Sequence, residues 1–128
     1  MDPAHEPTFR RGIDLFNRQQ FFVCHEVLEE IWTPARAPER LFLQALIHFA
    51  VGFYHHQRRN PTGAERQLRK GLKKIAGYLP EFLGIETEKL RDEVHRRLKA
   101  IAVGREMENF PQIRLRTPVA PGKVSGAR

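Results

Sequence analysis

Apolar positions recur along this chain with a helical period, and proline, glycine and asparagine interrupt them at short intervals. Phe9, Ile13 and Phe16 follow one another at i, i+4 and i+7, which predicts a first helix with Thr8 as its cap. The same spacing predicts further helices over about residues 20–33, 39–58, 61–78 and 87–103, and Asn60 and Thr87 should cap the last two. Because the connections are short, neighbouring helices should run antiparallel. We therefore expect an all-α fold, a single compact bundle of about five helices.

The sequence changes character after residue 110. Prolines and glycines recur there too closely for a helix to form. We expect an all-helical domain over residues 1–110 and an extended or disordered basic Pro/Gly-rich tail over residues 111–128, with Ile113 and Leu115 attaching the start of the tail to the bundle.

The composition is that of a soluble protein. The longest apolar run, about residues 41–54, is shorter than the ~20 residues that span a bilayer. Cys24 is the one cysteine and lies among apolar residues, so it is expected in the core and nothing requires an oxidising compartment. The acidic N-terminal segment lacks the apolar stretch of a signal peptide. These features predict a cytoplasmic protein with no membrane span.

The formal net charge of +7 is unevenly distributed. Residues 1–57 carry five Lys/Arg and seven Asp/Glu, a net of −2, whereas residues 58–128 carry seventeen and eight, a net of +9. The basic half could bind a polyanion, but it lacks interleaved aromatic residues on which bases would stack. A solvated basic face is the simpler interpretation.

Two polar stripes interrupt helices that are otherwise apolar. His25, Glu26 and Glu29 form the first stripe, and Gln44, His48 and His55 form the second, at helical spacing within residues 41–56. Imidazole and carboxylate groups are costly to bury without partners. Such stripes indicate a polar network, a metal centre or a proton-transfer site.

The helical wheel of the first stripe predicts which of its residues point inward. His25 and Glu29 fall between Trp32 and Phe22, in the sector expected to face other helices, whereas Glu26 points further toward solvent. An i, i+4 pair of this kind either ligates a metal or forms a buried hydrogen bond that fixes helix packing.

The second stripe adds ligands that the first could share. If the two helices pack antiparallel, His25, Glu29, His48 and His55 would form a mixed N/O set suited to a divalent metal such as zinc. Gln44 and Trp32 would then belong to the surrounding polar cluster or to the packing. The zincin motif His-Glu-x-x-His is absent, so a peptidase of that type is not expected.

At these residues the chain resembles a known family. The segments 21–32 and 38–47, followed by Tyr54-His55 and by Arg59-Asn60 with Gly63-Ala64, look like the family named domain of unknown function 309, over about residues 8–100. The resemblance implies a compact helical bundle that has been labelled a predicted metal-dependent hydrolase. His48 stands where the family pattern leads us to expect Gln. The matching positions are His25, Glu26, Glu29, Trp32, Gln44 and His55.

Three functions are compatible with these patterns. The first is an interaction or structural module with an internal His/Glu/Gln cluster, which contacts a protein partner or a second copy through its basic helices or its tail. The second is a metal-dependent hydrolase in which His25, Glu29 and His55 hold the ion and Glu26, as the catalytic residue, activates its water. The third is polyanion or nucleic-acid binding through the basic half.

The third function gives a direct prediction. We expect short DNA and RNA to show no submicromolar binding in fluorescence-anisotropy titrations at ~0.15 M salt, because the chain shows neither stacking aromatics nor a groove-reading helix motif. Submicromolar binding that is lost on changing Arg66, Arg69, Lys70 and Lys73 together would contradict this.

Overall fold

A computed structural model describes residues 1–107 and 109–116 of the chain. Helical elements dominate the described residues, as the apolar periodicity predicts. In chain order they are the 3₁₀ turn η1 (Pro3–His5), α1 (Glu6–Asn17), α2 (Phe21–Trp32), α3 (Glu39–Gln57), α4 (Pro61–Ile75), the 3₁₀ turn η2 (Ala76–Tyr78) and α5 (Thr87–Ala102).

Two helix starts differ from the sequence prediction. α1 begins at Glu6 because the η1 turn leads directly into it, so Thr8 lies inside the helix and does not cap it. Thr87 is buried and donates its hydroxyl hydrogen bond to the carbonyl of Tyr78 at 2.6 Å, so it ties α5 to η2. The predicted cap of α4 is confirmed, since the Asn60 side chain accepts a hydrogen bond from the Gly63 amide at 3.0 Å.

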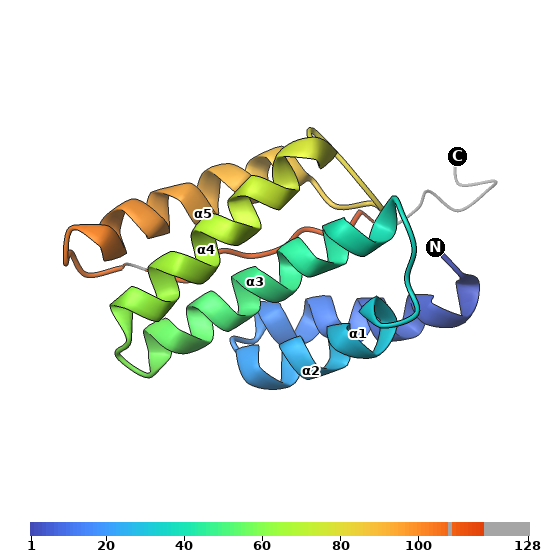
Figure 1. The fold of residues 1–128 in the computed structure, drawn as a ribbon, viewed down its shortest axis with the longest axis horizontal. Coiled ribbons are helices and arrows are strands. Elements are labelled where there is room, and N and C mark those ends of the chain that lie inside the picture. The colour runs from blue at the N-terminus through green and yellow to red at the C-terminus, as the bar shows by residue number, and fades with distance from the viewer. Residues whose placement is uncertain (108, 117–128) are drawn as a thin grey trace, which may run out of the picture.

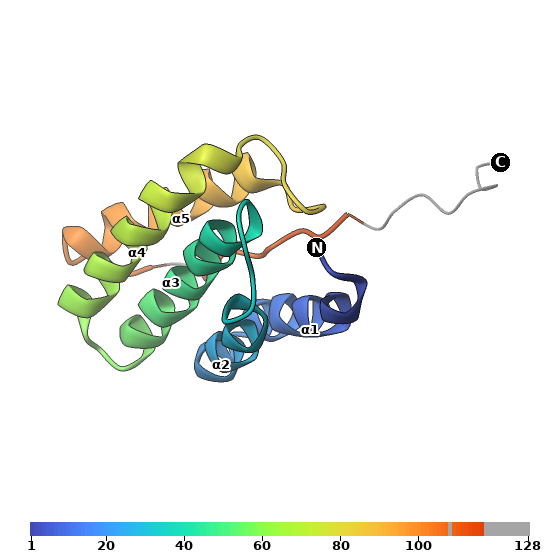
Figure 2. The ribbon, with the colours of Figure 1, turned by 45° about the vertical axis from the view of Figure 1, so that its right-hand side comes forward.

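The helices form two antiparallel hairpins and a fifth helix. α1 packs on α2, α3 packs on α4, and α5 lies against α4 on the side away from α2 (Figures 1 and 2). α3 therefore lies between α2 and α4. Within residues 1–107 and 109–116, no helix combines the length and apolar character needed to cross a membrane.

α3 is the central helix of the core. Phe42, Leu46, Phe49 and Phe53 on α3 are completely buried. Burying a large apolar side chain is worth roughly 1.5–3 kcal/mol, so these residues make α3 the main source of hydrophobic stabilisation. Between Leu41 and Phe53, the polar residues of α3 are Gln44 and His48, and both remain partly exposed.

Two glycines allow α3 and α4 to approach closely. A Cβ added at Gly71 of α4 would lie 2.5 Å from the Phe49 ring and 3.0 Å from the Ala45 carbonyl oxygen. A Cβ added at Gly52 of α3 would lie 2.7 Å from the Leu68 side chain. Neither helix has room for a side chain at these points, so glycine is required on both sides of the contact.

Residues 109–116 run behind the helices in an extended path in the view of Figure 1. Ile113 is buried, and its backbone amide and carbonyl both bond to the Asn17 side chain, at 2.7 and 2.9 Å. Phe110 packs against Phe21 and Phe53. Leu115 forms an isolated β-bridge with Ile85. The start of the expected tail is thus part of the core, while residues 117–128 lie outside the described part of the chain.

The α3–α4 contact gives a stability prediction. Gly71→Ala should lower the free energy of unfolding by about 1–3 kcal/mol in chemical denaturation, because the buried Phe49 ring cannot move aside for the new methyl group. Gly77→Ala is the matched control, since a Cβ added there would have nothing within 4 Å. Equal stability of both variants would show that the two helices are less tightly packed at Gly71 than these distances indicate.

Candidate functional site

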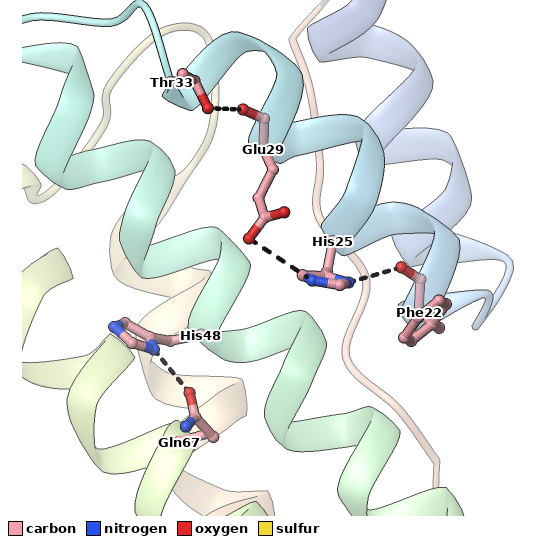
Figure 3. Close-up of polar contacts among 6 residues, drawn as sticks. All are labelled: Phe22, His25, Glu29, Thr33, His48 and Gln67. Atoms are coloured by element: carbon pink, nitrogen blue, oxygen red, sulfur yellow. Dashed lines mark hydrogen bonds and ion pairs between the residues drawn. The ribbon is translucent and has the colours of Figure 1, made fainter.

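His25 and Glu29 form a pair along the exposed side of α2. The His25 Nδ1–H donates to the Phe22 carbonyl at 2.9 Å, and its Nε2 lies 3.7 Å from the Glu29 carboxylate (Figure 3). The Glu29 side chain is about half exposed and the His25 side chain is mostly covered. The imidazole is therefore oriented by its own helix, and the carboxylate stays available to solvent.

Phe22 lies at the surface, contrary to the helical-wheel prediction. It is 46% exposed, while Phe21 beside it is buried. The buried arc of α2 centres on Cys24, which is itself completely buried as predicted, and this places Phe22 at the outer edge of the helix. The Phe22 ring lies 5.2 Å from the ring of His25 and 5.2 Å from that of Tyr54 on α3. Phe22 is thus held in place by aromatic contacts although half of it remains exposed.

His48 belongs to a different pair. Its Nδ1–H donates to Oε1 of Gln67 on α4 at 2.8 Å, and Figure 3 shows its ring on the side of α3 away from His25. Its Nε2 is buried without a hydrogen-bond partner. Burial lowers the pKa of His48 below its ordinary value of 6.5, and the nearby charges of Lys74 and Lys70 lower it further. The neutral form is favoured because a proton on Nε2 would find no acceptor.

The remaining predicted positions occupy separate places. His55 is partly buried at the end of α3, where its Nδ1 lies 3.4 Å from the Asn60 side-chain nitrogen. Gln44 is half-buried on the same side of α3. Glu26 is exposed on α2, as the helical wheel predicts.

The predicted metal ligands do not converge. Among the residues that the structure describes, no group of three or more His, Cys, Asp or Glu side chains could hold one ion. His48 is directed toward α4 by Gln67, His25 and Glu29 pair with each other on α2, and His55 lies at the α3–α4 turn. The residues present therefore do not fit a metal centre with three or four protein ligands.

Arg40 and Gln67 were not singled out by the sequence patterns. Arg40 donates from one guanidinium nitrogen to the Trp32, Thr33 and Ala35 carbonyls at 2.8, 3.1 and 3.3 Å, and it lies 4.1 Å above the Trp32 ring. Arg40 thus provides hydrogen-bond donors for backbone carbonyls at the C-terminal end of α2 and just after it. No sequence pattern pointed to Gln67, because its contact with His48 forms only when α3 and α4 pack together.

Helical spacing gathers the motif residues onto one surface, which we call the motif face. α3 runs along its middle, with α2 on one side and α4 on the other (Figure 3). All of its members are exposed or partly exposed. They are Phe22, His25 and Glu29 on α2, Leu41, Gln44, His48, Val51, Tyr54 and His55 on α3, and Gln67, Lys70 and Lys74 on α4.

The two edges of the motif face carry opposite charge. Glu29 lies on the α2 edge, whereas Lys70 and Lys74 lie on the α4 edge, close enough to His48 to lower its pKa. The strip of α3 between them carries no Asp, Glu, Lys or Arg from Leu41 to His55. The surface is therefore polarised across its width, with a neutral centre.

Comparison with known proteins agrees with the resemblance seen in the sequence. Residues 9–67 match the family described as "Domain of unknown function (DUF309)", a segment that includes nearly all of α1, all of α2 and α3, and the first half of α4. The chain is also 33% identical over 63 residues to "Uncharacterized protein YpuF" of Bacillus subtilis (strain 168). That alignment covers 48% of this chain and 36% of the relative, so the chain spans little more than a third of the relative's length.

The burial of His48 predicts a pH dependence of stability. The pKa of His48 is lowered in the folded protein, so as the pH falls the imidazole is protonated in the unfolded chain before it is protonated in the folded one. The free energy of unfolding should therefore be highest above about pH 6.5 and should decrease as the pH falls from 6.5 toward the pKa of His48 in the folded protein. His48→Gln should keep a partner for Gln67 and remove the part of this decrease that His48 causes, leaving the part due to His56, whose pKa burial also lowers.

Denaturation of both proteins at several pH values between about 7.5 and 5 measures the difference. His95→Gln, an exposed position on α5, is the control and should follow the wild type. A His48→Gln variant whose stability falls as steeply as that of the wild type would contradict the assignment.

Proposed function

We propose that this chain is a non-catalytic protein-interaction module and that its partner binds the motif face. The observation that carries the proposal is the surface position of Phe22, an aromatic side chain that is 46% exposed yet fixed by ring contacts on both sides. Aromatic side chains that are held in place before binding lose little entropy on complex formation and are frequent energetic anchors of interfaces.

The motif face carries exposed apolar side chains. Four large apolar side chains are exposed among the described residues, and two of them, Phe22 and Leu41, belong to this face. Leu41 is also 46% exposed and lies two helical turns from His48, at the opposite end of the motif face from Phe22. The two apolar contact points are separated by His and Gln side chains, so a partner that binds here must offer apolar groups at two places and hydrogen-bonding groups between them.

The polar groups of the motif face support binding more than catalysis. His25 and His48 each have a fixed partner, and their rings are separated by α3. A general acid and base must reach the same reacting group, which these two cannot do. The opposite charges along the two edges would instead orient a partner that carries basic groups on one side of an apolar contact and acidic groups on the other.

Site-specific photo-crosslinking tests the proposal. With p-benzoylphenylalanine in place of Phe22 in cells of the source organism, irradiation should give one discrete adduct of this chain. Leu41→Lys should abolish the adduct, because it places a charge in the apolar part of the same face.

The control is the same photoreactive residue at Val103, which is 69% exposed at the end of α5 and is not part of the motif face. It should give no such adduct, and Val103→Lys should leave the Phe22 adduct intact. Equal crosslinking from both positions, or an adduct that Leu41→Lys does not affect, would reject the motif face as the binding surface.

A further inference from the structure

We infer that the occupant of the motif face is a second copy of this chain, bound about a twofold axis that runs parallel to α3. This inference rests on the proposed function and names its partner. A twofold pair buries the same patch on both copies, so the patch must be complementary to itself.

The charge distribution selects the direction of the axis. A twofold axis parallel to α3 places the α2 edge of one copy on the α4 edge of the other, so Glu29 meets Lys70 and Lys74. An axis lying across α3 would place Glu29 against Glu29 and the lysines against each other. Opposite charges favour the first arrangement and like charges disfavour the second.

The positions of the charged residues along the helices also agree with an axis parallel to α3. α2 runs from Phe22, beside Tyr54, to Trp32, beside Arg40, so Glu29 lies near the level of Gln44. α4 runs antiparallel to α3 with Gly71 beside Ala45, so Lys70 and Lys74 bracket that level. With a parallel axis, levels along α3 are preserved between the copies. Glu29 therefore faces the partner's lysines without any shift along the helix.

The size and chemistry of the surface suit such a pair. The 12, 19 and 15 residues of α2, α3 and α4, at 1.5 Å per residue and about 9 Å between helices, give a footprint of about 600 Å² per copy. Stable interfaces of standard size bury about 800 Å² of accessible surface per partner. Leu41 and the uncharged strip of α3 lie on the axis, where each would meet its own counterpart.

Charge reversal tests the pairing by sedimentation equilibrium of the full-length chain. Wild type should form a dimer of twice 14.9 kDa with a Kd in the micromolar range. Glu29→Lys alone, and Lys70→Glu with Lys74→Glu, should each raise the Kd about tenfold or more, because the contact occurs twice in the dimer. An equimolar mixture of these two variants should restore dimerisation, since both of its contacts are again between opposite charges.

Matched controls lie one residue away from the tested positions, after Glu29 on α2 and before Lys70 and Lys74 on α4, and are turned by about 100° about the helix axis. Glu30→Lys, and Arg69→Glu with Lys73→Glu, make the same changes in net charge outside the motif face and should leave the Kd within about twofold. If the control variants weaken the dimer equally, or if the mixture of the two face variants stays monomeric, the pairing is wrong.

Disulfide trapping tests the axis directly. Leu41→Cys should form a covalent dimer rapidly under mild oxidation, while Val103→Cys should not. Cys24 does not interfere, because its thiol is buried and its pKa is raised to about 12. Equal rates for the two variants would overturn the inference.

The inference and the proposed function can fail separately. A wild-type chain that stays monomeric at millimolar concentration overturns the self-pairing. If Phe22 still forms an adduct of different mass that is sensitive to Leu41→Lys, the interaction module stands with another protein as its partner. If neither experiment shows an association, both are rejected.

Discussion

The close approach of α3 and α4 is the contact on which the rest of the structure depends. Gly52 and Gly71 leave no side chain between the two helices, so the Leu68 side chain and the Phe49 ring lie directly against the facing backbone. This contact fixes the rotation of α3 about its own axis. That rotation turns the Phe side chains of α3 into the core and leaves Leu41, Gln44, His48 and His55 in the strip between α2 and α4. A different rotation would bury the polar strip and expose the aromatic core.

The sequence predicted the fold class and the helices well, because a helix that buries one face repeats apolar residues at a spacing that the sequence shows directly. It located α2 and α3 to within a residue or so and found the Asn60 cap. It erred at Thr8 and Thr87, where tertiary contacts override local capping preferences: η1 extends α1 backward, and the Thr87 hydroxyl bonds across to Tyr78. Such contacts join residues whose proximity exists only after folding.

The candidate site was predicted less completely. The two polar stripes do lie on one surface, but the direction of each side chain depends on its partner. Gln67 turns His48 toward α4, and the Phe22 carbonyl holds His25 on α2, so two histidines that a wheel diagram places near each other end on different sides of α3. The exposure of Phe22 was also missed, because the inward sector was placed around His25, whereas the buried arc of α2 centres on Cys24. Helical periodicity thus predicted which residues share the surface, but not which of them contact one another.

The two hydrogen bonds between the Asn17 side chain and the Ile113 backbone have a consequence for how the chain folds during synthesis. They join residues 96 positions apart and hold down the segment that carries Phe110 onto Phe21 and Phe53. The core beneath α1 and α2 therefore remains open until nearly all of the described chain has left the ribosome. Nascent chains arrested shortly before Ile113 should expose an aromatic surface, and completion of the fold is coupled to the emergence of Phe110 and Ile113 rather than to that of the first hairpin.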